Sequence, residues 1–288
     1  MTVVGAPRPP GAAEVTGPPG VLAELRTWAA IAAASARANV AYRATVAASV
    51  LSNVTLTVLR GYLALAVWEA RPGLAGYDTH RAVTFVVLGQ ALMTTYAVFG
   101  GMIDVPWRVE NGGIVIDVAR PFRFLHWWLA QDLGRAAVFA VSRALPAGLV
   151  GLALFGAAPP ASLAAAAGFA ASLPLALLVS FGIRYLVGLT AFWITDARGA
   201  LSVSALTLTF FSGAVLPLTI FPGAFGEVAR ALPYGAIIQV PMDIYLRPAG
   251  GVGIGEALAF QAGWAAVLLI ASDLLTRQAL RRVVTQGG

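Results

Sequence analysis

A short polar stripe interrupts the first long apolar run of this sequence. Asn53, Thr57 and Arg60 follow one another at helical spacing, and Arg60 would lie roughly 25 Å along the helix from Arg43 at about 1.5 Å per residue. A guanidinium keeps its charge and donates hydrogen bonds in a planar fork. The stripe would therefore suit a pathway for an anionic or amphipathic cargo. The alternative is that Arg60 extends outward to lipid headgroups near Trp68.

Two further arginines, Arg143 and Arg184, also fall inside apolar runs. A charge at mid-bilayer costs about 2.5 to 3.5 kcal/mol on insertion scales, so each needs a partner or a route to the surface. Because the run around Arg184 is long, we expect this side chain to reach the cytoplasmic surface by snorkelling. For Arg143, inward snorkelling and pairing with a carboxylate are both open.

The residue types exclude several kinds of reactive site. The sequence has no cysteine, and all 19 basic residues are arginine. Thiolate chemistry is therefore ruled out, and so is a Walker-type phosphate loop, which needs a lysine. His80 and His126 fall in segments predicted on opposite sides of a membrane, so they share no metal. We expect no catalytic residue, no metal and no cofactor on this chain.

Composition places the elements that carry these residues in a membrane. Of 288 residues 59% are hydrophobic and 11% are charged, with a mean hydropathy of +0.80, whereas a soluble domain carries about 25% charged residues. The net charge of +6 does not indicate a nucleic-acid partner, because the arginines punctuate apolar runs and form no basic stripe with exposed aromatics. The lipid bilayer is the partner that this pattern predicts.

The predicted fold is all-α, with six membrane spans in a single domain covering residues 21–288. The spans are expected at about 44–68, 81–103, 134–157, 164–195, 200–221 and 254–276. Residues 1–20, rich in Pro and Gly, are interpreted as a disordered cytoplasmic arm. Residues 21–43 are interpreted as a helix lying in the membrane interface, with the start of the first span as the alternative.

Arginine distribution sets the predicted orientation. With both termini inside, twelve arginines fall in cytoplasmic segments and four in outer ones, as the positive-inside rule expects. The same count favours one long fourth span over two spans divided at Pro174. The absence of lysine and the abundance of Ala and Gly favour a bacterial plasma membrane.

Two connecting segments differ from ordinary loops. The cytoplasmic segment 104–133 contains Pro106 near its start, which can begin a short helix, and Gly112 and Gly113 must end that helix. We expect a projecting knob that a partner could bind. The outer segment 222–253 contains two apolar pieces too short to cross a bilayer, which predicts a re-entrant or interfacial cap.

The order of these features resembles the permease subunits of type-2 ATP-binding-cassette exporters, in particular a bacterial branch similar to drug and viologen exporters. The resemblance rests on the interfacial helix, the Arg108 to Gly113 turn, Phe192-Trp193 closing the fourth span, and Phe211-Ser212-Gly213 with Pro217 in the fifth. It covers nearly the whole chain after residue 20. It implies two permeases, identical or related, driven by two cytosolic ATPase subunits that bind ATP and Mg²⁺.

The resemblance also implies roles for particular residues. The coupling element that enters a cleft of the ATPase would comprise Asp104, Trp107, Arg108, Glu110, Gly112 and Gly113. A solvated loop without a partner is the alternative. In the fifth span, Phe210, Phe211 and Ser212 would face the pathway as an aromatic gate, with ordinary helix packing as the alternative. The cargo would be an amphipathic small molecule such as a drug or antibiotic, a lipid or a peptide.

The residue types and their positions disfavour three other functions. An ion-coupled secondary transporter would require carboxylates within the membrane, and the sequence places all of them in connecting segments or near span ends. An intramembrane enzyme would require a cluster of His, Asp or Lys at one depth. A purely structural anchor would leave the knob and the cap without a purpose. The secondary transporter is the main alternative to the ATP-driven permease.

Overall fold

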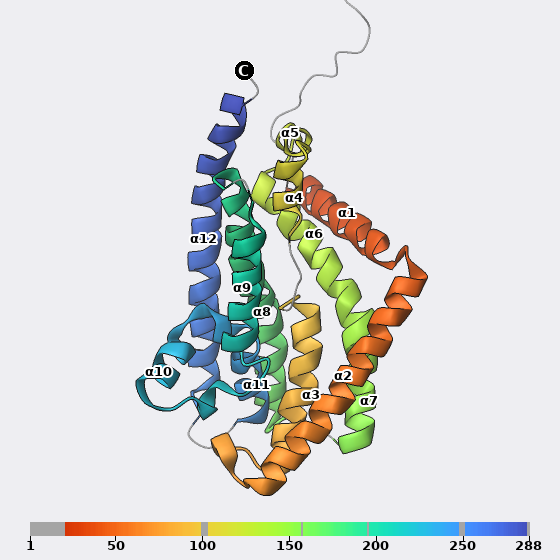
Figure 1. The fold of residues 1–288 in the computed structure, drawn as a ribbon, viewed down its shortest axis with the longest axis vertical. Coiled ribbons are helices and arrows are strands. Elements are labelled where there is room, and N and C mark those ends of the chain that lie inside the picture. The colour runs from red at the N-terminus through yellow and green to blue at the C-terminus, as the bar shows by residue number, and fades with distance from the viewer. Residues whose placement is uncertain (1–20, 99–102, 157, 195, 248–250, 287–288) are drawn as a thin grey trace, which may run out of the picture.

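The computed structural model describes residues 21–98, 103–156, 158–194, 196–247 and 251–286, and over these ranges it contains helices and no β-strand. The helices form an elongated bundle (Figure 1). The predicted arm, residues 1–20, and the expected end of the second span, residues 99–102, lie outside the described residues. The all-α prediction is confirmed for the part of the chain that is described.

Four long rods build the bundle, and each is long and apolar enough to cross a bilayer. The first rod is α2 (Arg43–Ala70). The second is a continuous rod made of α6 (Phe124–Phe139), η2 (Ala140–Ala144) and α7 (Leu145–Phe155). The third consists of α8 (Leu163–Leu189) and η3 (Thr190–Phe192), and the fourth is α12 (Ile254–Gln286). Pro174 lies inside α8 without dividing it. Two shorter helices, α3 (Thr79–Thr95) and α9 (Arg198–Phe211), occupy the other expected spans, so the count of six remains a prediction.

The remaining helices lie at the two ends of the bundle (Figure 1). Near the C-terminus are α4 (Val105–Glu110), α5 (Ile114–Val118) and the oblique α1 (Val21–Val40). The opposite half holds η1 (Leu74–Gly76), η4 (Leu218–Ile220), α10 (Gly223–Ala231), η5 (Pro233–Ala236) and α11 (Gln239–Leu246). Ala41 and Tyr42 separate α1 from α2, so α1 is not the start of that rod.

Three expected boundaries are wrong. The helix of the second span ends at Thr95, eight residues before the expected 103. The third begins at Phe124 instead of 134, so the polar-looking start of α6 belongs to the rod and not to a connecting segment. The fifth ends at Phe211 instead of 221, because Gly213 adopts a φ of 85° that a right-handed helix cannot contain.

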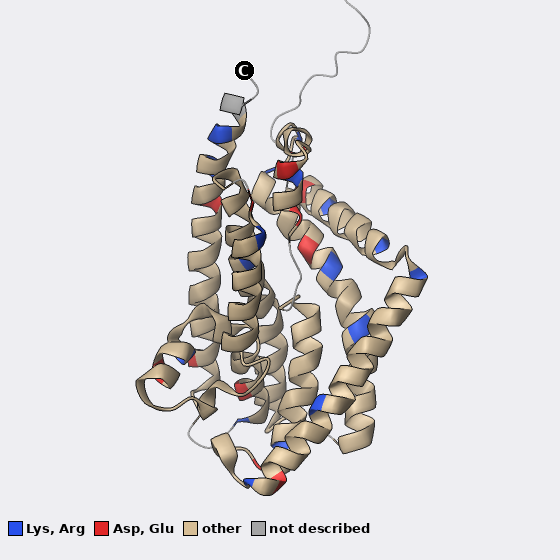
Figure 2. Cartoon of the chain, viewed as in Figure 1, with Lys and Arg blue, Asp and Glu red and all other residues tan. Residues whose placement is uncertain are grey.

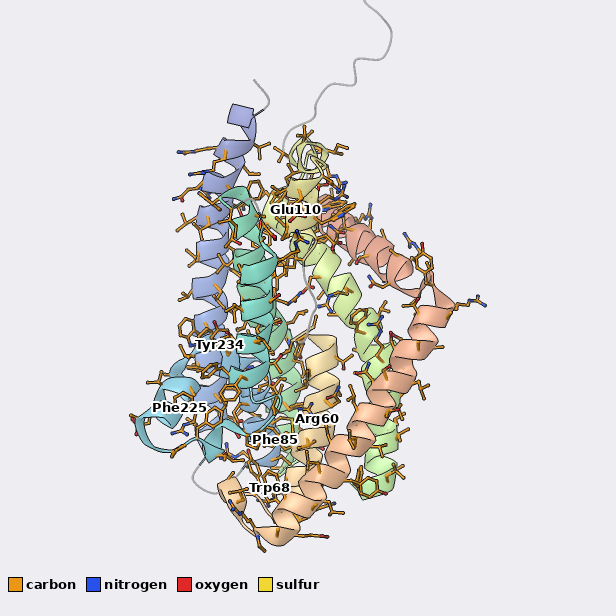
Figure 3. All side chains as sticks on the ribbon, in the orientation of Figure 1. Arg60, Trp68, Phe85, Glu110, Phe225 and Tyr234 are labelled. Carbon is orange, nitrogen blue, oxygen red and sulfur yellow. The ribbon has the colours of Figure 1, made fainter. Side chains whose placement is uncertain are left out.

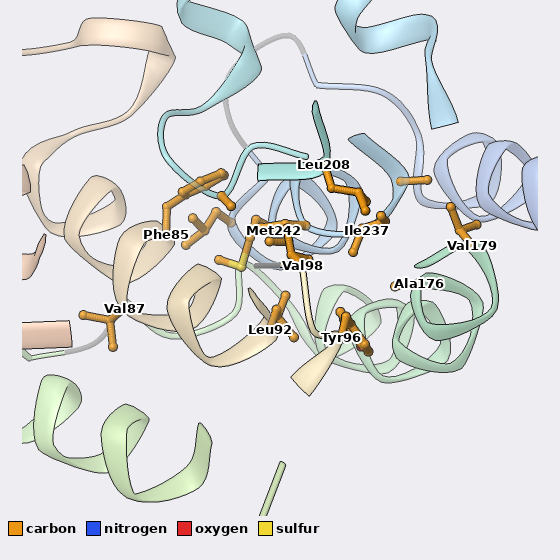
Figure 4. Close-up of a cluster of buried hydrophobic side chains, with 14 of the residues drawn as sticks. Phe85, Val87, Leu92, Tyr96, Val98, Ala176, Val179, Leu208, Ile237 and Met242 are labelled. Carbon is orange, nitrogen blue, oxygen red and sulfur yellow. The ribbon is translucent and has the colours of Figure 1, made fainter. Parts of the chain in front are cut away.

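The core lies where α3, α8, α9 and α11 meet. Figure 4 shows Phe85, Leu92 and Tyr96 beside Leu208 and Met242 in this cluster. Lipid is as apolar as these side chains, so close packing and not escape from water must hold the helices together. Glycines allow that packing: Gly182 approaches Leu268 of α12 so closely that a Cβ there would lie 2.7 Å from the leucine Cβ.

Charged residues are sparse along the rods and gather toward the two ends of the bundle (Figure 2). A few basic positions interrupt the long rods, in agreement with the arginines noted in the sequence. Because a charge within a bilayer is costly, each of these side chains requires an explanation from its contacts.

Candidate functional site

The predicted knob is a pair of short helices, α4 and α5, joined by a glycine turn. Pro106 lies in the first turn of α4, where its missing N–H costs no hydrogen bond. Gly112 has a φ of 74°, and the Asn111 side-chain oxygen accepts a hydrogen bond from the Gly113 N–H at 2.9 Å. The glycine turn thus ends α4 as the sequence predicts, and a second helix follows at once.

A buried carboxylate, Asp117, holds the two short helices together. Its side chain is fully buried, and its oxygens lie 3.3 Å from Arg108 Nε and 3.1 Å from Arg120 Nη2. The Arg120 guanidinium in turn lies 3.8 Å from the centre of the Trp127 ring on α6. Arg108 was expected to face a partner and here belongs to an internal ion-pair network. Its role toward a partner stays a prediction.

Sequence reasoning missed Asp117, although Asp117 and Arg120 stand at the i,i+3 spacing of a helical ion pair.

The outer surface of the knob is apolar and exposed. Trp107 is 61% exposed and Ile116 is 63% exposed. Glu110 is also exposed, at the end of α4 (Figure 3). Partial desolvation raises the pKa of Asp104 above its usual value, and the charge of Arg108 opposes that shift. The knob thus presents large apolar side chains at its surface, and the Arg108 guanidinium lies 5.9 Å from the centre of the Trp107 ring.

The base of the knob is packed tightly against the rods. Val105 is fully buried, and Pro106 packs beside Gly188 of α8, where an added Cβ would lie in ordinary contact 3.7 Å from Pro106 Cδ. Tyr185 of α8, in the same apolar cluster, shares a 2.8 Å hydrogen bond with Thr276 of α12. A displacement of α4 must therefore be transmitted to α8 and α12, because packed interiors are stiff.

The polar stripe of α2 does not line one surface. Arg60 donates to the Gln90 side chain of α3 and to the Ala214 carbonyl, each at 2.5 Å. Figure 3 shows Arg60 on α2 within the bundle half opposite α4. Asn53 accepts from Thr94 of α3 at 2.5 Å, whereas Thr57 is fully buried. Arg60 thus points into the bundle, and the alternative of outward snorkelling is wrong.

Arg184, which was expected to snorkel, is buried, and that prediction is also wrong. Its Nη1 and Nη2 donate to the two oxygens of Asp132 on α6 at 3.1 and 2.6 Å. Arg135 Nε donates to the same carboxylate at 2.8 Å, and Arg135 Nη1 donates to the Thr95 carbonyl at the end of α3 at 3.2 Å. Asp132 compensates two buried cations, so neither needs to reach the surface.

The proposed aromatic gate is part of a larger ring cluster at the end of α9. Phe210 packs on Phe211 and Phe221 with ring centres 5.1 and 5.2 Å apart, and Phe211 lies 6.1 Å from Tyr234. Phe225 completes the cluster (Figure 3). Ser212 is fully buried, and its hydroxyl accepts from the Ala214 N–H within the turn, so it lines no surface of the described chain.

The break after α9 is stabilised by a glutamine that sequence reasoning missed. Gln239 Oε1 accepts from the Leu218 N–H at 2.8 Å, and the Gln239 N–H donates to the Ser212 carbonyl at 3.0 Å. The Gln239 amide donates to Asp243, which also accepts from the Tyr77 hydroxyl, both at 2.8 Å. Unwound backbone is tolerated at membrane depth where protein groups satisfy it in this way.

Within the described residues no group of three His, Cys, Asp or Glu side chains could hold a metal ion.

Comparison with known proteins identifies the architecture. The model of the ABC-2 family transporter proteins matches residues 54–287 of the chain. The match covers the second half of α2 and everything after it, including the knob, the broken α9 and the segment between α9 and α12. No curated protein matches the chain.

Proposed function

The chain belongs to the ABC-2 transporter family, and from this premise we propose that it is the permease subunit of an ATP-driven exporter. It is a multi-pass membrane protein and a component of a transporter. Separate ATPase subunits would bind ATP and Mg²⁺, because this chain has no lysine for a phosphate loop. A second permease, identical or related, would complete the translocation pathway.

In this proposal both termini and the knob face the cytoplasm of a bacterium. The arginine distribution supports that orientation, since twelve arginines fall in the segments expected on the cytoplasmic side and four in the outer ones. The cargo would be an amphipathic small molecule, a lipid or a peptide. The scarcity of charge along the rods supports an amphipathic cargo over a highly charged one.

The observation that carries the proposal is the structure of the knob. An exposed apolar tip, with Trp107 and Ile116, is suited to insertion into a cleft on another protein. Its buried base contacts α8, so a force on the tip reaches the membrane rods. A solvated loop would need neither the exposed tryptophan nor the buried Asp117.

Co-purification tests the proposal. We expect a tagged full chain expressed in its own host to recover a lysine-containing P-loop ATPase. Ile116→Ser should reduce that recovery because it removes apolar contact area at the tip. Val252→Ser is the matched control, since Val252 is 63% exposed, like Ile116, and lies before α12 in the opposite half of the bundle. Robust ATP hydrolysis by the purified chain alone would contradict the proposal.

One observation favours the alternative of an ion-coupled secondary transporter. Asp243 is partly buried and accepts hydrogen bonds from two neutral groups, Tyr77 and Gln239, and no ion pair with it is found among the described residues. Such a carboxylate can gain and lose a proton. Proton-driven uptake in liposomes without any ATPase, abolished by Asp243→Asn, would establish this alternative in place of the first.

A further inference from the structure

A polar cavity of about 630 Å³ lies among α1, α2, α3 and α6. Its size falls within the range of about 300 to 1,000 Å³ that is typical of small-ligand sites. Neutral hydrogen-bonding side chains from four helices contribute to its wall: Ser35, Asn39, Asn53, Thr94 and Gln131. The exposed side chain of Leu56 also lines it, so the cavity reaches the surface of the bundle beside α2.

Two arginines in this wall have unused hydrogen-bond donors. Arg135 Nη2 and Arg143 Nε are shielded from solvent and have no hydrogen-bond partner. Both guanidinium groups lie against the ring of Phe139, that of Arg135 at 5.0 Å and that of Arg143 at 3.6 Å from the ring centre. Buried donors without acceptors are rare in folded proteins, which points to an acceptor that binds from outside.

The balance of charge in the wall favours an anion. Asp132 lines the cavity, but Arg184 and Arg135 already compensate it. Asp104 also lines the cavity and is exposed, and its carboxylate opposes anion binding at that edge. Arg143 makes no ion pair with any described carboxylate, although it lies in the middle of a rod that is apolar enough to span a membrane.

The backbone at Arg143 is unusual as well. Residues Ala140–Ala144 form a π-helical turn inside an otherwise α-helical rod, directly before Pro146. Single π turns in α-helices are retained mostly at functional sites, because the wider turn costs stability and redirects the side chains that it carries. The distortion and the uncompensated cation therefore coincide in one turn of the rod.

We infer that this cavity binds a phosphate group, and that the phosphate belongs to the headgroup of an anionic phospholipid. Arginine forks bind phosphate oxygens through two parallel hydrogen bonds, and Asn and Gln amides supply the further donors that such a group accepts. A lipid is the source because Arg143 lies at membrane depth and the cavity reaches the bundle surface beside α2. The inference goes beyond the proposed transport function and does not depend on an ATPase.

Native mass spectrometry of the purified full chain in neutral detergent tests the inference, with phosphatidylglycerol as one titrant and inorganic phosphate as the other. We expect one phosphatidylglycerol to bind, and Arg143→Gln to weaken it by roughly tenfold or more, the loss typical of a hydrogen bond to a charged group. Arg281→Gln, which removes an exposed arginine of α12, is the control and should leave the affinity unchanged.

A second variant keeps the test valid if Arg143→Gln fails to fold. Leu56→Trp should fill part of the cavity from α2 without changing any charge, and should weaken phosphatidylglycerol binding likewise. If inorganic phosphate binds and phosphatidylglycerol does not, and if Arg143→Gln and Leu56→Trp weaken phosphate binding while Arg281→Gln does not, the phosphate site is supported. The inference that the phosphate belongs to a lipid is then overturned. Equal losses of phosphatidylglycerol affinity in Arg143→Gln and Arg281→Gln would overturn the inference, and so would full affinity in Leu56→Trp. Neither outcome bears on the co-purification of an ATPase, which tests the proposed function separately.

Discussion

The substitution Asp132→Asn should destabilise the protein strongly, although the asparagine side chain has almost the same shape as that of aspartate. Asp132 is buried and receives three hydrogen bonds of 3.1 Å or less from Arg184 and Arg135. The amide would leave two buried guanidinium groups without a counter-charge. Removing one partner of a buried ion pair costs about 3 to 5 kcal/mol. That cost is a large part of a typical total stability of about 5 to 15 kcal/mol.

A matched control is present in the same chain. Asp273 on α12 also contacts two arginines, Arg123 at 2.8 Å and Arg277 at 2.6 Å, but these arginine side chains are 60% and 66% exposed. Solvated ion pairs contribute about 0 to 1 kcal/mol. Asp273→Asn should therefore have a small effect, although it removes the same charge from the same kind of arginine pair.

The assay is equilibrium unfolding of the detergent-solubilised full chain, followed by tryptophan fluorescence. The reasoning predicts a loss of unfolding free energy in Asp132→Asn that exceeds the loss in Asp273→Asn by about 2 kcal/mol or more. Adding Arg184→Met to Asp132→Asn should restore part of the stability, because it removes one of the stranded charges. Equal effects of the two aspartate variants would refute the view that burial makes the Asp132 network strong.

Three further changes test the packing and the broken helix. Gly134→Ala would place a Cβ 2.0 Å from the Ala32 carbonyl oxygen and should detach α1 from α6, so limited proteolysis should cut the chain faster near Ala41. Gly148→Ala is the control, since a Cβ there meets nothing within 4 Å, and it should not change the rate of cleavage. Arg60→Gln should cost about 1.5 to 3 kcal/mol in the same unfolding assay, because it removes a charged donor from the Ala214 carbonyl, and an unchanged midpoint would count against the inward orientation. Gly112→Ala should destabilise the knob by about 1 to 2 kcal/mol because of its φ of 74°, visible as faster amide exchange in α4 and α5; unchanged exchange would show that the turn tolerates a side chain.

The location of the long rods follows from local sequence, because hydropathy over about 20 residues is enough to indicate a span. The expected ranges 44–68 and 164–195 agree closely with α2 and with the rod formed by α8 and η3. The turn at Gly112 is predicted by local chemistry too, since a glycine after a short helix is the usual way to end it. The resemblance to type-2 ATP-binding-cassette permeases, drawn from the order of such features, is confirmed by the family match, whereas the bacterial drug-exporter branch stays a prediction.

Errors in the predicted boundaries have a common physical cause. The start of α6 reads as polar because of Gln131 and Asp132, yet the carboxylate is compensated by an arginine 52 residues away on α8. The end of α9 reads as helical, yet Gln239 of α11 satisfies its unwound backbone. In both places a side chain that is distant in the sequence changes the conformation that the local segment can adopt.

The sequence by itself determined that this is a membrane protein, where most of its rods lie and where its knob turns, because these properties depend on composition and on neighbours within a few residues. Only the tertiary structure decided what each charge does. Arg184 became half of a buried pair, Arg60 a donor to a broken helix, and Arg143 an uncompensated cation in a cavity. The partner of a charge is set by packing between segments that are distant in the sequence, and periodicity along the chain carries no information about which distant segments come together.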